Sequence, residues 1–187
     1  MAADSRALMI DGAIRLLAQR GLQGASFTEV LAATGAPRGS IYHHFPGGKD
    51  ELVAAAITSM GARTRATLDT VAGSPPVEVA GFFLGLWREL LVRSQFTAGC
   101  SVLAVTVATD SADLLGTAAG VFRDWREALT SLLERSGAQP GAAAGFAALL
   151  IASSEGAVVM SRASQSLEPF DVVAAQLLAQ AAALPRA

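Results

Sequence analysis

The stretch SFTEVLAATGAPRGSIYHHF, residues 26–45, decides the fold of the first part of the chain. Ser26 and Glu29 form a capping-box signature, which predicts that a helix begins after Ser26 and covers residues 27–34. Gly35 follows this helix, and glycine is the residue that most readily adopts the left-handed backbone just past a helix end. The sequence therefore predicts a short helix that ends in a tight turn.

A second short helix is predicted directly after this turn, over residues 38–45. Pro37 fixes a backbone angle that suits a first helical turn, and the apolar Ile41 and Phe45 lie about one turn apart. Two short helices joined by a three-residue turn indicate a helix-turn-helix, whose second helix enters the major groove of DNA.

Longer helices are predicted on both sides of this motif. Residues 4–20 have apolar side chains at helical spacing, and Gly21 ends the pattern. The sequence PGG at 46–48 breaks the second short helix, and a long helix is predicted from residue 49 to about residue 71. Its first turn contains two acids, which suit the positive end of a helix dipole.

The rest of the chain is predicted to be a separate helical bundle. The sequence AGSPPVE at 72–78 is typical of a linker. Five apolar segments of helical length follow, at 77–94, 101–111, 113–136, 140–163 and 169–184. The β-branched run VLAVTV at 102–107 is ambiguous between helix and strand. We expect an all-α fold of about nine helices. Its parts are a three-helix DNA-binding domain (1–48), a connecting helix (49–72) and a C-terminal domain (77–187).

Composition restricts the class of protein. The chain has 187 residues, of which 52% are hydrophobic. We expect no bilayer-spanning segment, because no apolar run reaches the roughly 18 uncharged residues that spanning needs. The N-terminus has no signal-peptide signature, and the single Cys100 cannot form an internal disulfide, so we expect a cytoplasmic protein. The excess apolar surface then requires a subunit interface or an internal cavity.

Charge is divided unevenly along the chain. Residues 1–65 contain seven basic and five acidic side chains, whereas residues 66–187 contain seven basic and eleven acidic ones. A basic first part on an acidic remainder indicates an anionic partner at one end only.

The start of the second short helix carries groups that can read bases. Arg38 can bond bidentately to guanine, Ser40 can pair with several bases, and Gly39 permits close backbone approach.

Phosphate-binding groups are predicted to follow. Tyr42, His43 and His44 offer hydroxyl and ring nitrogen groups to phosphate oxygens. Lys49 and free amides near 47–48 would bind phosphate at a helix N-terminus. Tyr42 could instead be half-buried packing. Metal binding by the two histidines is disfavoured, because adjacent residues point about 100° apart on a helix.

The stretch SFTEVLAATGAPRGSIYHHFPGGKDEL resembles the DNA-binding signature of the TetR family of transcriptional regulators, which covers roughly residues 5–52. The form HHFPGGK, together with AGCSVLAV at 98–105, is most similar to the LmrA/YxaF-like branch. The resemblance implies a homodimeric repressor of a palindromic operator. Its helical C-terminal domain would bind a small effector and dimerise.

The resemblance also implies roles for individual residues. Ser26 and Thr28 match backbone- and base-contacting positions. Arg38, Gly39 and Ser40 match the family's base-reading positions. The phosphate-facing positions are matched by Tyr42, His43, His44 and Lys49. Two features depart from the family pattern. Pro37 stands where a serine cap is common, and three residues separate Phe45 from Lys49 where many members have two.

The C-terminal part shows no catalytic motif: it lacks Ser-His-Asp spacing, a P-loop, a Rossmann glycine pattern and paired cysteines. We therefore expect neither an enzyme nor a cofactor. Aromatic and soft residues could line an apolar effector pocket; they are Phe83, Trp87, Phe96, Cys100, Leu103, Phe122, Trp125, Phe146 and Met160. For any one of them plain core packing is the alternative. Polar contacts would come from Arg88, Arg126 and Glu155 if they point inward, although exposure is the stronger expectation.

The last two segments are apolar around too much of their circumference for surface helices. We expect them to form a four-helix interface with a second copy of the chain. The alternative is a pair of core helices in a monomer. Two alternative functions also stay open: a ligand-independent DNA-binding protein, and a small-molecule-binding helical protein whose helix-turn-helix is only structural. Activation in place of repression is a further alternative.

Overall fold

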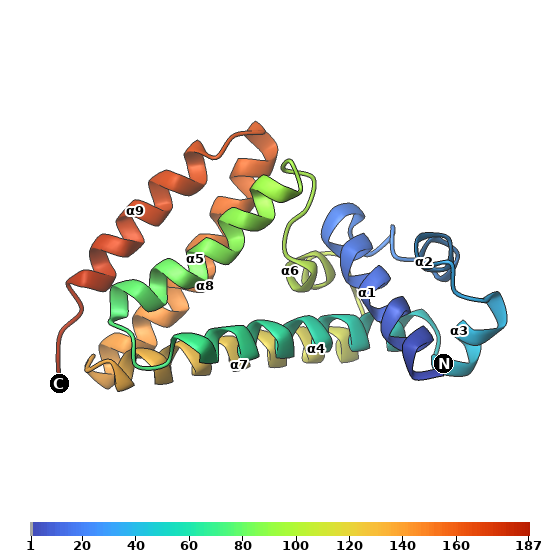
Figure 1. Ribbon diagram of the computed structural model, residues 1–187, viewed down its shortest axis with the longest axis horizontal. Coiled ribbons are helices and arrows are strands. Elements are labelled where there is room, and N and C mark those ends of the chain that lie inside the picture. Colours follow the sequence, from blue (N-terminus) through green and yellow to red (C-terminus); the bar gives the residue numbers. More distant parts are fainter. Residues whose placement is uncertain (1) are drawn as a thin grey trace. The chain divides into compact units, whose positions relative to one another are not determined.

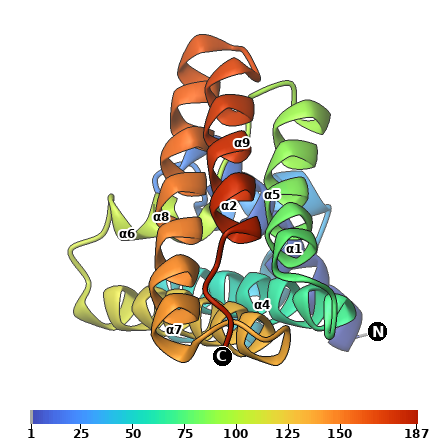
Figure 2. The ribbon, with the colours of Figure 1, turned by 90° about the vertical axis from the view of Figure 1, so that its left-hand side faces the viewer.

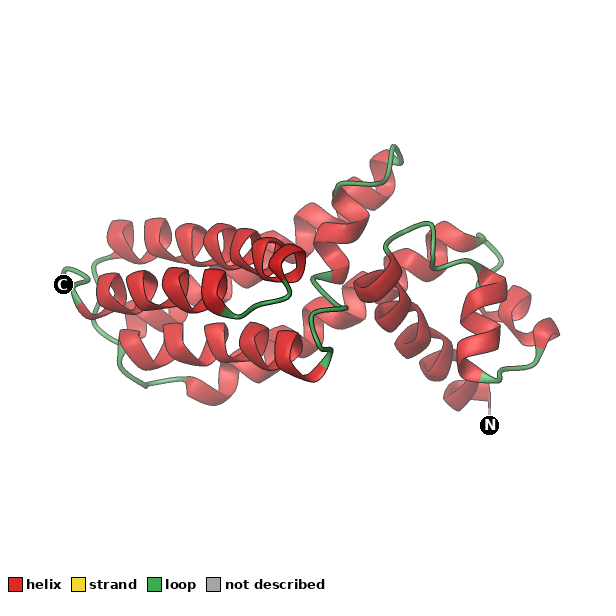
Figure 3. Cartoon of the chain, turned by 90° about the horizontal axis from the view of Figure 1, so that it is seen from above, coloured by secondary structure: helices red, strands yellow, loops and turns green. Residues whose placement is uncertain are grey.

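The computed structural model describes residues 2–187, and within this range every regular element is helical (Figure 3). The α-helices are α1 (Ala2–Arg20), α2 (Phe27–Thr34), α3 (Arg38–His44), α4 (Lys49–Leu68), α5 (Pro76–Arg93), α6 (Ser101–Thr106), α7 (Ala112–Arg135), α8 (Pro140–Ser164) and α9 (Glu168–Ala182). A short 3-10 helix, Asp69–Val71, follows α4. The predicted all-α class and the predicted order of helices are confirmed.

One predicted segment, 101–111, differs from the observed helix. The ambiguous run at 102–107 is helical through Thr106, where α6 ends, and Val107 is the C-cap. Its predicted continuation to residue 111 is replaced by a loop in which the Thr109 hydroxyl accepts a hydrogen bond from the Ser111 amide at 3.1 Å. Side chains that bond to nearby backbone in this way compete with helix formation.

The chain divides into two compact units. One contains the chain through Ala62 together with Cys100–Val121, and the other contains Arg63–Gly99 and Phe122–Ala187. Two unit boundaries fall inside α4 and α7, and the third lies just before α6. The functional division at residues 48 and 72 stays a prediction.

The first unit is built around α1, α2 and α3, which lie together (Figure 1). Its core includes the fully buried Met9, Leu17, Val30, Ile41 and Phe45. On the surface, Arg20 of α1 donates to the Glu29 carboxylate of α2 at 2.7 Å. The α6 helix also packs against α1 within this unit.

The second unit is a helical bundle. Helices α5, α8 and α9 run side by side (Figure 2), and α5 contacts both of the others. Large apolar side chains from four helices fill its interior; they include Phe83, Leu91, Trp125, Leu150 and Phe170. The Ser161 hydroxyl of α8 accepts a hydrogen bond from the Phe170 amide at 3.1 Å, which fixes the start of α9.

The last residues of the chain close this bundle. The Gln139 amide donates to the Pro185 carbonyl at 2.9 Å, and the Ala187 amide donates to the Gly137 carbonyl at 3.0 Å. The tail therefore pairs with the loop between α7 and α8 and satisfies backbone groups there.

By length and composition, α8 is apolar enough to cross a membrane. The expectation from sequence did not include this segment, because the charged Glu155 interrupts its run of uncharged residues. Half of the most apolar stretch of α8 is buried within the chain, which is also the pattern of a core helix.

Candidate functional site

The turn between α2 and α3 is shaped by its local sequence. The Ser26 hydroxyl caps α2 by accepting a hydrogen bond from the Glu29 amide at 3.2 Å. Gly35 has a left-handed backbone with φ of 68°, and its amide donates to the Leu31 carbonyl. Pro37, with φ of −61°, is the N-cap of α3 and offers no side-chain hydrogen bond. The predicted cap, turn and helix boundary at residues 27–34 are confirmed.

One face of α3 points to solvent and the other holds it in place. Ile41 and Phe45 are fully buried. Arg38, Gly39 and His43 are exposed, and a side chain at Gly39 would meet open space. A hydrogen-bonding face with an unobstructed backbone fits the approach of a DNA groove.

Tyr42 is exposed and also serves to brace the motif. Its side chain is 61% accessible to solvent. Its ring meets the Phe27 ring of α2 edge-on, with 5.5 Å between centroids. The hydroxyl-bearing ring thus has a fixed position on the surface. Thr28, on the same helix as Phe27, is exposed as well.

Ser40 differs from its neighbours on α3. Its hydroxyl oxygen is covered, and it has no hydrogen-bond partner among residues 2–187. The hydroxyl must rotate or become uncovered before it can contact a base, so Ser40 has the weakest geometry of the predicted base-reading residues.

The two histidines differ in exposure. His43 is exposed and His44 is partly covered. Their rings lie edge to face with 5.3 Å between centroids, and His44 also contacts the Phe45 ring at 6.5 Å. The guanidinium carbon of Arg6 lies 5.3 Å from the Phe45 ring centroid. His43 is therefore the better placed of the pair for a phosphate contact.

The prediction of free amides before α4 is wrong. The Gly47 amide donates to the Glu51 carboxylate at 2.8 Å, and the Gly48 amide donates to the Phe45 carbonyl at 3.0 Å. An acid at the third position of a helix reaches back to cap the preceding backbone. Glu51 at the start of α4 was the available signal for this cap. Lys49 remains as the predicted phosphate-binding group and is partly exposed.

Four of the predicted pocket residues form a contiguous aromatic cluster inside the second unit. The ring centroids of Phe83 and Trp87 lie 6.1 Å apart. The Trp125 ring lies 6.4 Å from that of Trp87 and 5.7 Å from that of Phe122. All three contacts are edge-on, which is a favoured aromatic geometry. The cluster joins α5 to α7, and three of its four rings are buried.

The other predicted pocket residues are placed differently. Phe146 is buried and Phe96 is partly covered. Met160 is 49% exposed on α8 and faces outward. Cys100 is buried, as expected, and its sulfur caps α6 by accepting from the Leu103 amide at 3.4 Å. Cys100 and Leu103 belong to the first unit, apart from the aromatic cluster.

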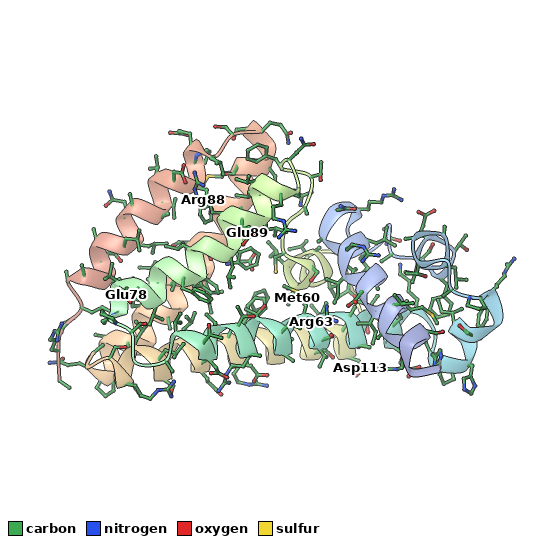
Figure 4. The ribbon with its side chains drawn as sticks, viewed as in Figure 1. Met60, Arg63, Glu78, Arg88, Glu89 and Asp113 are labelled. Carbon is green, nitrogen blue, oxygen red and sulfur yellow. The ribbon has the colours of Figure 1, made fainter. Side chains whose placement is uncertain are left out.

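Of the three charged residues considered for the pocket, only Glu155 is buried, with 7% of its surface exposed. Arg126 is exposed. Arg88 lies on the surface of α5 (Figure 4) and donates to the Asp171 carboxylate of α9 at 2.9 Å. This hydrogen bond and the charge of Asp171 raise the pKa of Arg88. Arg88 therefore links two helices of the bundle.

Comparison with known proteins gives the family. The family model described as "Bacterial regulatory proteins, tetR family" matches residues 9–56, and that of "Transcriptional regulator LmrA/YxaF-like, C-terminal domain" matches residues 76–176. An uncharacterized HTH-type transcriptional regulator of Mycobacterium tuberculosis is 32% identical, with 92% of this chain and 91% of the relative covered. The HTH-type transcriptional regulator LmrA of Bacillus subtilis is 26% identical, with 89% of this chain and 90% of LmrA covered.

Solved structures agree on the fold. The regulatory protein TetR from Rhodobacter sphaeroides superposes with a TM-score of 0.82 at 22% identity, with 96% of this chain and 98% of that chain covered. A TetR transcriptional regulator from Chloroflexus aurantiacus superposes with a TM-score of 0.80 at 25% identity, with 99% of this chain and 98% of that chain covered. The chain belongs to the TetR family of DNA-binding transcriptional regulators, and its C-terminal domain is of the LmrA/YxaF-like type.

Proposed function

We propose that this regulator is a cytoplasmic homodimeric repressor that binds a palindromic operator and is released from it by a small apolar effector. The observation that carries the effector part is the aromatic cluster of Phe83, Trp87, Trp125 and Phe122 inside the second unit. Concave sites for small molecules are lined mainly by apolar and aromatic side chains with few polar groups.

The proposed contacts with DNA come from the exposed face of α3 and its surroundings. Arg38 would read a base, Tyr42 and His43 would contact phosphates, and Lys49 would bind a phosphate beside α4. Thr28 and Gly39 would lie against the DNA. Ser26, Ser40 and His44 are the other residues that we propose to contact the DNA. Support comes from the exposure of Arg38, Gly39, Tyr42 and His43 on one side of the helix.

The proposed dimer interface is the outward face of α8 together with α9. This face carries exposed apolar or small residues at helical spacing; they are Gly145, Ala148, Leu149, Ala152, Gly156, Val159, Met160 and Ala163. A side chain at Gly145 or Gly156 would meet open space, so a second helix can approach closely there. Val172 on α9 is exposed too. Met160 is thus assigned to the interface rather than to the effector pocket.

The mechanism that we propose is reciprocal antagonism between operator and effector. An effector that binds one conformation of the dimer better shifts the spacing of the two α3 helices, which must match half-sites one DNA turn or a multiple of it apart. By thermodynamic linkage the operator weakens effector binding by the same factor.

Selection of bound sequences from random DNA tests this proposal. A recovered pair of inverted half-sites at a fixed spacing is expected for a dimer that reads both. Unrelated sequences, or a single half-site, would contradict it. A screen of apolar compounds for release of the recovered operator then separates a ligand-responsive repressor from a ligand-independent DNA-binding protein.

A further inference from the structure

Trp87 carries a buried hydrogen-bond donor that the protein does not use. The residue is 6% exposed. Its indole Nε1 has no hydrogen-bond partner among the described residues. A tryptophan N–H usually finds a partner when it is buried, and each unpaired buried polar group in a native protein needs an explanation.

The position of this donor connects it to the proposed effector site. Trp87 is the middle member of the aromatic cluster, with Phe83 on one side at 6.1 Å and Trp125 on the other at 6.4 Å between centroids. Its neighbour in sequence, Arg88, points to the surface and pairs with Asp171, so α5 turns the Trp87 ring inward. A polar group among aromatic rings is the usual means by which an apolar site orients its ligand.

Charges in the interior restrict the ligand. Among the residues whose burial the structure describes, the only buried charged side chain is that of Glu155, and no arginine or lysine is buried. An anionic ligand would have no buried cation to pair with, and an unpaired buried charge is strongly unfavourable. A protonated amine could not accept a hydrogen bond from the indole N–H, because an ammonium group carries donors and no acceptor.

We infer that Trp87 Nε1 donates a hydrogen bond to the effector, and that the effector is an uncharged apolar molecule with one buried acceptor, such as a carbonyl oxygen. This inference rests on the proposed effector response and adds the chemistry that the site recognises. The aromatic rings supply the apolar contact area, and the Trp87 donor fixes the orientation of the ligand.

Matched pairs of ligands that differ only in the acceptor test the inference. Benzophenone and diphenylmethane form one such pair, and acetophenone and ethylbenzene form a smaller one. We expect the ketone of a pair to bind the full-length protein about three- to tenfold more tightly than its hydrocarbon, the effect of one neutral hydrogen bond. Calorimetric titration measures both affinities.

Two variants test whether the preference for the ketone depends on Trp87 Nε1. Trp87→Phe keeps an aromatic ring and removes the N–H, so the ketone preference should disappear while the hydrocarbon affinity stays similar. Trp125→Phe removes the other indole of the cluster and should leave the preference intact. A ketone preference that persists in Trp87→Phe would overturn the inference.

A spectroscopic measurement reports on the bond itself. The protein contains two tryptophans, so its ¹H–¹⁵N spectrum has two indole signals, which the two variants assign. The ketone should shift the Trp87 indole proton downfield, and the hydrocarbon should not. Equal binding of ketone and hydrocarbon to the wild type would overturn the Trp87 assignment but leave the effector site standing. If no compound of either pair binds, the effector site at this cluster is itself refuted.

Discussion

At the scale of single residues, we propose that base reading and phosphate binding belong to different side chains. Arg38 is exposed at the first turn of α3, with the open backbone of Gly39 beside it. Lys49 is placed at the start of α4, close in sequence to the capped amides of Gly47 and Gly48. Because both amides are already bonded, the proposed phosphate contact of Lys49 would depend on the charge of its own side chain.

Arg38→Ala should relax sequence preference at one position of each half-site. A bidentate arginine–guanine contact contributes about 1–3 kcal/mol of discrimination. Affinities for the operator and for random DNA, measured by titration at one salt concentration, give the ratio that should fall. An equal loss on both DNAs would show that Arg38 contacts only the backbone.

Lys49→Ala should weaken binding to all sequences alike. Loss of one phosphate contact lowers the slope of log affinity against log salt by about one. The measurement is a salt titration of operator binding for the wild type and the variant. Lys49→Arg keeps the charge and serves as the control, and an unchanged slope in Lys49→Ala would remove this residue from the interface.

At the scale of elements, short helices depend on their caps. The α2 helix has eight residues, and isolated helices of that length are marginal in water. The Ser26 hydroxyl supplies the bond at its N-terminus and the left-handed Gly35 ends it. The helix that positions α3 is therefore stabilised by a few local bonds and by packing of Val30, which is fully buried.

Ser26→Ala should destabilise the protein without DNA present. Loss of an N-cap side chain costs about 1 kcal/mol, which corresponds to a fall in Tm of about 2–4 °C for a chain of this size. Thermal unfolding followed by circular dichroism measures it. Ser153→Ala, inside α8, is the control and should change Tm by less. A variant as stable as the wild type would mean that the cap bond is dispensable.

At the scale of the whole molecule, the proposed dimer interface on α8 and α9 should account for the excess of apolar residues. The outward face of α8 bears Leu149, Val159 and Met160, each between two- and three-fifths exposed. Their spacing along α8 places them on one face of the helix, and a contiguous exposed apolar patch marks an interaction site. Paired recognition helices are needed to read two half-sites, so assembly and operator affinity are expected to fail together.

Val159→Asp should convert the proposed dimer to a monomer, because two copies would then bury unpaired charges at the proposed interface. Val92→Asp on α5 is a matched control: Val159 is 52% exposed and Val92 is 48% exposed. Sedimentation velocity gives the oligomeric state of each. A Val159→Asp protein that remains dimeric, or a Val92→Asp protein that dissociates, would contradict the assignment of the interface to α8.

The sequence by itself determined the helix-turn-helix. Its boundaries depend on Ser26, Gly35 and Pro37, whose effects act within one turn of backbone, and the bounds of α2 follow from them residue by residue. The sequence also placed the long helices, because apolar periodicity and breakers such as the PGG stretch are local as well.

Only the tertiary structure decided which side chains meet. Trp87 and Trp125 are 38 positions apart in the sequence and in contact across α5 and α7, whereas Met160, equally apolar in the sequence, faces outward. The direction of a side chain on an apolar helix is set by the rotation of that helix against its neighbours. That rotation depends on packing between distant segments, so no local pattern could specify it.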